Sequence, residues 1–324
     1  MSKRWLILSA AFAVVLVACG GDGTAVVTSP DGTTTVATTP DDGHGHVVET
    51  YVQNAADFAG TKAADWDNAE TVRVELGEYY FTPSALTFEA GKPYKVELVN
   101  VGQIKHEFTA EDFFASVAWR KAESGQSEIK APYFTEIEVF AGQTVELFFV
   151  PISTGTFDLL CEIEGHLEAG MRGTVTVVGT PPTTPLPILT AFADGPWFAG
   201  GADLVAAADW SAMETVEVEL IEFAFAPNEI HLKVGQPYKL VFNNTGAVKH
   251  EATASDFFNT IAFRKAEDAS GEFKAPTLVE VETFAGAETD LFLIPQVAGT
   301  YDIVCLIEGH FEAGMFGTIV VEGA

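Results

Sequence analysis

Cysteine and basic side chains are scarce in this 324-residue chain. Three cysteines are present, and 17 lysines and arginines stand against 46 aspartates and glutamates, which gives a formal net charge of −29. This charge argues against nucleic acid or an anionic lipid surface as a partner, because both carry the same sign. It favours steering toward a basic partner or a cationic substrate. Alternatively, the acidic surface suits a salty habitat, since net charge reports on solubility and association.

The few cysteines do not form a disulfide framework. Cys161 and Cys305 occupy equivalent positions in two copies of an internal repeat, so they cannot form a bridge within one domain. A disulfide framework requires paired cysteines inside one small fold. Unpaired cysteines in an exported chain need another role, and metal ligation is the natural one.

Long apolar runs are absent beyond the N-terminus. Residues 5–17 follow two basic residues and are too short to remain as a transmembrane helix, which is typical of a signal peptide. The run ends Leu16-Val-Ala-Cys19-Gly, which resembles the lipobox of bacterial lipoproteins. That resemblance implies a signal peptide over residues 1–19, with lipid on Cys19 that holds the protein on a membrane outside the cytoplasm. The alternative is an ordinary secretory signal with a cysteine there by chance.

The segment after Cys19 lacks aromatic residues. Residues 20–47 are mostly Thr, Gly, Asp, Pro and small apolar residues, which cannot bury enough surface to fold. We therefore predict a flexible linker. His44 and His46 near its end are able to bind a stray metal ion, but a solvated linker explains them better.

The rest of the chain is a tandem repeat with an offset of 144 residues and no net insertion. Asp65-Trp66 recurs as Asp209-Trp210, Lys105-His106-Glu107 recurs as Lys249-His250-Glu251, and Cys161 recurs as Cys305. A Pro/Thr-rich linker at residues 180–190 separates the copies. These features predict one domain over residues 48–179 and a second over residues 191–324.

Within each copy, hydrophobicity alternates with a period of two, which indicates strands. In the first copy, strands are predicted at 71–76, 94–99, 135–139, 144–150 and 174–178. Turns are expected at 90–93 and 141–143, and a short helix within 110–123. Several short strands at this spacing predict a sandwich or a barrel.

The candidate metal ligands lie on one loop in each copy, with the spacing Cys-x4-His-x4-Met. A second histidine precedes each cysteine by 55 residues. Two His and one Cys with a weak axial Met form the ligand set of blue-copper electron-transfer sites, because thiolate and thioether suit Cu(I) and imidazole suits both oxidation states. The eight predicted ligands of two type 1 copper ions are His106, Cys161, His166 and Met171, and His250, Cys305, His310 and Met315.

Around these ligands the chain resembles the cupredoxin family, the blue-copper proteins related to plastocyanin, azurin and rusticyanin. The matching text is Asn100-Val-Gly-Gln-Ile-Lys-His106 and Gly155-Thr-Phe-Asp-Leu-Leu-Cys161, with the equivalent text in the second copy. The resemblance covers both repeats. It implies an all-β fold of two tandem Greek-key β-sandwich domains, type 1 copper and outer-sphere electron transfer. As a departure, Glu107 and Glu251 follow the first histidines, where many relatives carry a neutral residue.

Three functions compete. Multicopper oxidases and copper nitrite reductases need a catalytic copper site with extra histidines, commonly one beside the cysteine. Here Leu160 and Val304 precede the cysteines, and only His231 remains in the folded part. An enzyme is therefore not expected from this chain alone, unless trimers or partners supply ligands.

The two remaining functions are an electron carrier and a copper-binding or copper-delivery lipoprotein without a redox partner. A rigid, complete ligand set favours reversible electron transfer, because delivery sites usually need easy exchange. We therefore expect an extracytoplasmic carrier, anchored through lipid, whose redox partner has a basic docking surface.

Overall fold

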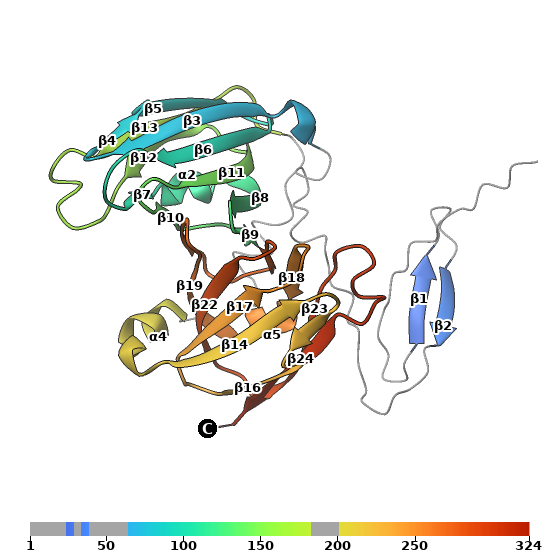
Figure 1. The fold of residues 1–324 in the computed structure, drawn as a ribbon. Helices are drawn as coiled ribbons and strands as arrows, with labels where there is room; N and C mark the ends of the chain where they lie inside the picture. The colour runs from blue at the N-terminus through green and yellow to red at the C-terminus, as the bar shows by residue number, and fades with distance from the viewer. Residues whose placement is uncertain (1–23, 29–33, 39–63, 183–200, 324) are drawn as a thin grey trace, which may run out of the picture. The chain divides into compact units, whose positions relative to one another are not determined.

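The computed structural model describes residues 24–28, 34–38, 64–182 and 201–323 (Figure 1). Residues 1–52 and residues 53–324 form two compact units. In the first unit, strands β1 (Thr24–Thr28) and β2 (Thr34–Thr38) pair antiparallel. Both fall within residues 20–47, for which the composition predicts no regular structure. The predicted lipid site Cys19, and also His44 and His46, lie outside the described residues.

The first repeat is built almost entirely of strands. Its elements are η1 (Trp66–Asn68), β3 (Glu70–Gly77), β4 (Tyr80–Thr82), β5 (Ala85–Glu89), β6 (Tyr94–Asn100), β7 (His106–Phe108), α2 (Glu111–Phe114), β8 (Val117–Ser124), β9 (Ser127–Lys130), β10 (Glu136–Val139), β11 (Thr144–Pro151), β12 (Gly155–Leu160) and β13 (Arg172–Val178). All five strands predicted from periodicity are present, and α2 is the short helix predicted within residues 110–123.

The second repeat has the same order of strands. Its elements are α4 (Gly201–Ala207), η2 (Trp210–Ala212), β14 (Glu214–Ile221), β15 (Ala224–Ala226), β16 (Glu229–Lys233), β17 (Tyr238–Asn244), β18 (His250–Thr253), α5 (Ser255–Phe258), β19 (Ile261–Glu267), β20 (Gly271–Lys274), β21 (Glu280–Thr283), β22 (Glu288–Pro295), β23 (Gly299–Val304) and β24 (Phe316–Glu322). The predicted all-β class, with two cupredoxin-like repeats, is confirmed.

Alternating burial along the strands explains why this sequence forms sheets. In β6 every second side chain from Tyr94 is buried, because successive residues of a strand face opposite sides of the sheet. The buried side chains meet around Phe88, Phe113 and Phe149, whose ring centroids lie 5.3–5.6 Å apart. Burying each such ring contributes about 1.5–3 kcal/mol, so this aromatic cluster is a major part of the first core.

Strand pairing brings the two halves of each predicted metal site together. Thr109, just after β7, exchanges backbone hydrogen bonds of 3.0 and 2.9 Å with Leu160 at the end of β12. His106 begins β7 and Cys161 follows β12. In the second repeat, β18 and β23 pair at Thr253 and Val304. The distant histidine is thereby held beside the cysteine loop.

Strands of the two repeats also pair with each other. β10 pairs with β20, and β9 pairs with β21, so an eight-stranded and an eleven-stranded sheet each contain strands from both repeats. β20 and β21 are the second-repeat equivalents of β9 and β10, so the contact is reciprocal. The sequence predicted two tandem sandwich domains, and it contained no signal for strand pairing between them. The repeats pair because each has open strand edges, and open edges pair when a matching edge is available.

Candidate metal centre

The structure brings three of the predicted ligands together in each repeat. The donor atoms of His106, Cys161 and His166 lie within 4.8 Å of one another, as do those of the equivalent residues His250, Cys305 and His310. These are the two His/Cys groups of this kind among the described residues. In both repeats the cysteine Sγ lies 3.3 Å from Nδ1 of the loop histidine. The two histidine rings are 5.1 Å apart in each site.

The loop between β12 and β13 closes on itself through backbone hydrogen bonds. The Met171 N–H donates to the His166 carbonyl at 3.0 Å, and the Cys161 N–H donates to the Met171 carbonyl at 3.2 Å. Gly165 and Gly170 adopt φ values of 87° and 107°, which side chains rarely tolerate. Met171 is fully buried, as is Met315 on the equivalent loop. The loop therefore holds cysteine, histidine and methionine close together in the chain's interior.

Burial disfavours the charged forms of the two cysteines and of the first histidine. Burial raises the pKa of the Cys161 thiol, and it raises the pKa of the Cys305 thiol to about 11. Burial and the neighbouring His166 lower the pKa of His106. The Glu107 N–H donates to Cys161 Sγ at 3.3 Å. A cation would favour the thiolate, because metal binding requires deprotonated ligands and releases a proton.

The glutamate after the first histidine does not join the donor group. Glu107 Oε2 accepts a hydrogen bond of 2.9 Å from the Glu162 N–H, and Glu251 accepts one from the Thr253 hydroxyl. Burial, followed by repulsion from neighbouring carboxylates, raises the pKa of Glu107 to about 7 and that of Glu251 to about 8. Neither glutamate belongs to the groups of donor atoms that lie within 4.8 Å of one another, as expected for neighbours on a strand.

Three residues outside the ligand set also shape the first site. Asn100 Nδ2 donates to the carbonyls of Ile104 and Val139 at 2.8 Å each, which fixes the loop before His106. Glu78 and Tyr79, in the turn between β3 and β4, lie against the histidines. Sequence analysis missed these two. The sequence feature that could have indicated them is their recurrence 144 residues later as Glu222 and Phe223.

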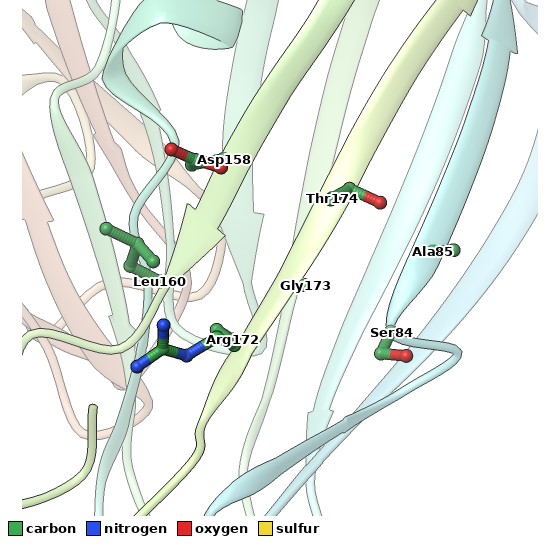
Figure 2. Close-up of a pocket in the computed structure, with 7 residues that line it drawn as sticks. All are labelled: Ser84, Ala85, Asp158, Leu160, Arg172, Gly173 and Thr174. Atoms are coloured by element: carbon green, nitrogen blue, oxygen red, sulfur yellow. The ribbon is translucent and has the colours of Figure 1, made fainter. Parts of the chain in front are cut away.

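Other candidate features lie apart from the two donor groups. His231 is exposed on β16, with Nε2 2.8 Å from Glu229 Oε1, so it is a surface residue of a strand. An open pocket of about 340 Å³ has Asp158, Leu160 and Arg172 on one side and Ser84 and Ala85 on the other (Figure 2). Leu160 and Arg172 are sequence neighbours of Cys161 and Met171, but the pocket lining contains none of the predicted ligands.

The donor chemistry fits copper. Each site offers a cysteine sulfur and two imidazoles, and a buried methionine lies on the cysteine loop. Thiolate, imidazole and thioether together suit both Cu(I) and Cu(II). Neither ring nitrogen of His106 or His250 has a hydrogen-bond partner among the described residues, although both rings are buried. Buried polar atoms are normally paired, and a bound metal ion would satisfy one nitrogen of each ring.

An all-β fold with a buried His–Cys–His group on a strand and a loop defines a class of metal-binding β-sandwich proteins. The Cupredoxin-like domain model matches residues 52–177. The copper-resistant cuproprotein CopI of Rubrivivax gelatinosus is 31% identical over 111 residues, which cover 34% of this chain and 67% of that protein. The chain belongs to the cupredoxin family, as the sequence motifs predicted.

Two further proteins are similar. The copper-resistant cuproprotein CopI of Pseudomonas aeruginosa is 25% identical over 138 residues, with 34% of this chain and 76% of that protein covered. A Cu-containing nitrite reductase from Thermus scotoductus SA-01 is 14% identical with a TM-score of 0.28, covering 78% of this chain and 62% of that protein. At this TM-score the likeness says nothing about activity.

None of the helices in the described part of the chain has the length and hydrophobicity that a membrane span requires.

Proposed function

We propose that this protein binds two copper ions as type 1 sites, one in each repeat, and carries electrons. The observation that supports this most directly is the pair of equivalent buried groups, each with His, Cys and His donor atoms within 4.8 Å. Copper is also the metal in the names of both cuproprotein relatives.

The rigid surroundings of each site favour electron transfer over release of the metal. Backbone hydrogen bonds close the cysteine loop, among them those from the Met171 and Cys161 N–H groups, and the distant histidine belongs to a strand. A scaffold that holds one geometry in both oxidation states limits rearrangement when the ion gains or loses an electron. The residues of this chain would thus bind and orient the ion and exclude water, while the ion supplies the one-electron chemistry.

The proposal includes a location and a partner. Lipid on Cys19 would anchor the protein to a membrane outside the cytoplasm, and the acidic surface would meet a redox partner with a basic docking surface. We expect no oxidase or nitrite reductase activity, because the described residues contain no further group of His or Cys ligands.

A second function is copper binding or copper delivery without a redox partner. The relatives favour it, since both are named copper-resistant cuproproteins. The two functions differ in whether the ion leaves. A carrier retains copper through repeated reduction and oxidation, whereas a delivery protein transfers Cu(I) to an acceptor.

The first test is a Cu(II) titration of the soluble form lacking residues 1–19, followed by visible absorption. We expect an intense charge-transfer band that saturates at two copper ions per chain and is bleached by reductant. Cys161→Ser and Cys305→Ser should each halve it, because the band arises from the copper–thiolate bond. Copper binding without the band would contradict type 1 ligation. Loss of copper to a Cu(I) chelator within a few redox cycles would favour delivery.

A further inference from the structure

A strained turn lies against each donor group. In the first repeat, Glu78 and Tyr79 connect β3 to β4, whose Gly77 and Tyr80 are paired. Tyr79 adopts φ of 71° and its equivalent Phe223 adopts φ of 63°; these are the two non-glycine residues with positive φ in the described part of the chain. The second central position of such a turn normally requires glycine. Strain of this kind persists where the surrounding structure imposes it, often at functional sites.

The aromatic residue of the turn contacts the loop histidine. The ring centroids of Tyr79 and His166 are 5.2 Å apart with an interplanar angle of 87°, and those of Phe223 and His310 are 5.2 Å apart at 83°. Such edge-to-face geometry is favourable for aromatic pairs. Tyr79 is 43% exposed whereas His166 is 5% exposed. The tyrosine ring therefore lies between the imidazole and solvent.

The glutamate of the turn faces the other histidine. Glu78 Oε1 accepts the Gln103 N–H, and Glu222 Oε1 accepts the Ala247 N–H. A Cβ on Gly102 would lie 2.6 Å from Glu78 Oε1 and 3.0 Å from His106 Nε2. The carboxylate and the imidazole nitrogen thus border the same small space.

The second repeat reproduces this arrangement. A Cβ on Gly246 would lie 3.0 Å from both Glu222 Oε1 and His250 Nε2. His106 and His250 are both fully buried, and their ring nitrogens lack hydrogen-bond partners among the described residues. An acceptor and an unpaired ring nitrogen therefore lie beside the same glycine in both sites.

We propose that this two-residue turn is the outer layer of each metal site and positions both histidines. The carboxylates of Glu78 and Glu222 face Nε2 of the first histidine without a hydrogen bond to it in the structure. Their negative charge favours the Nε2–H tautomer, which leaves Nδ1 for the metal. Tyr79 and Phe223 hold the ring of the second histidine and shield it from water. The proposal rests on the proposed function in that these histidines are taken as ligands.

The chemical consequence follows from the charge of the carboxylate. A carboxylate beside the N–H of a ligating imidazole favours that tautomer and makes the ring a stronger donor to the metal. A stronger donor with a nearby negative charge favours Cu(II) over Cu(I). Each turn should therefore lower the reduction potential of its own site.

The test of the glutamate uses Glu78→Gln and Glu78→Ala in the Cys305→Ser background, where only the first site is complete. In the metal-free protein, 15N NMR should show His106 as the Nε2–H tautomer, with a changed Nε2 shift in both variants and an unchanged His250. In the copper form we expect a tenfold or greater shift of the redox equilibrium toward Cu(I), about 59 mV for one electron.

Glu75→Gln is the matched control, because it removes the same charge from a partly exposed residue of β3 that pairs with Arg73. It should change neither the His106 signal nor the potential. Unchanged His106 signals in both Glu78 variants would overturn the proposal. The NMR result does not depend on copper, so a failure of the proposed function remains distinguishable from a failure of this inference.

The aromatic residue is tested with Tyr79→Gly, because glycine accepts positive φ and the ring is then removed without backbone strain. The rate at which a water-soluble imidazole reagent modifies His166 in the metal-free protein should rise at least threefold, while the rate for His310 stays constant. Tyr79→Phe should match the unsubstituted protein, since Phe223 occupies this position in the second repeat. An unchanged rate in Tyr79→Gly would show that the ring does not shield the histidine.

Discussion

Among single residues, Met171 and Met315 have two possible roles, ligation of the metal or packing of the core. Each is fully buried, and each backbone N–H donates to the carbonyl of the loop histidine at 3.0 Å. A buried methionine is ordinarily core filling. The backbone hydrogen bonds fix each methionine on the loop that carries the cysteine and the second histidine, where its thioether would be a further ligand.

Met171→Leu separates ligation from packing. Leucine has a similar volume, so the free energy of unfolding of the metal-free protein should change by less than about 1.5 kcal/mol. Leucine removes a donor atom and makes the surroundings of the ion more apolar, which disfavours the more highly charged Cu(II). We expect a higher reduction potential at the first site alone, measured by redox titration in the Cys305→Ser background.

Met315→Leu in the Cys161→Ser background is the matched variant and should shift the second site in the same direction. A potential unchanged in both variants would assign the methionines to the core.

At the scale of elements, the ligand loop depends on two left-handed glycines. Gly170 has φ of 107°, and a Cβ built there would meet no atom within 4 Å. Any cost of adding a side chain is therefore a backbone cost. A substitution at Gly170 therefore tests the backbone conformation of the loop and leaves its side-chain packing unchanged.

Gly170→Ala should destabilise the protein by about 1–2 kcal/mol, because alanine is strained at positive φ. Chemical denaturation of the metal-free protein measures this, and copper affinity at the first site should fall with it. Gly125→Ala is the control: its Cβ also meets no atom within 4 Å, but its φ is not positive. Equal stabilities for the two variants would mean that the loop relaxes to another conformation.

At the scale of the whole molecule, the contact between the repeats joins unlike residues at equivalent positions. Ser124 Oγ and Ser127 Oγ each donate to Asp268 Oδ2 at 2.6 Å. Ser124 and Asp268 are separated by the repeat offset of 144 residues, so the same position is serine in one copy and aspartate in the other. Asp268 also accepts the N–H groups of Ser270 and Gly271. Because only one of the two equivalent positions is aspartate, the contact between the repeats buries a single carboxylate, and serine hydroxyls and backbone N–H groups supply its hydrogen bonds.

Asp268→Ala should lower the free energy of unfolding by about 2–4 kcal/mol, because several buried donors lose their acceptor. Asp256→Ala, at an exposed position of α5, should change it by about 0.5 kcal/mol or less.

A second variant tests the equivalence of the two positions. Ser124→Asp should also destabilise, since it places two carboxylates together, and the double exchange Ser124→Asp/Asp268→Ser should recover part of that loss. If the double variant is no more stable than Ser124→Asp, the two positions do not interact as a pair.

Much of this protein could be predicted from local patterns in the sequence. Alternating hydrophobicity located strands such as β3 and β6, because side chains of a strand face alternate sides regardless of the partner strand. The Cys-x4-His-x4-Met spacing located the ligand loops, and the repeat offset located the second copy of each. These features lie within a few residues of one another or recur at one interval, so no tertiary information is needed to see them.

Other features were decided only by the tertiary structure. The pairing of β10 with β20 and of β9 with β21 depends on which strand edges remain open after each repeat has folded, and an edge has no sequence signature of its own. Glu78 and Tyr79 are 28 and 87 residues from the histidines that they approach. Their role arises because strand pairing and a left-handed turn direct two side chains at one site, and that convergence exists only in the folded chain.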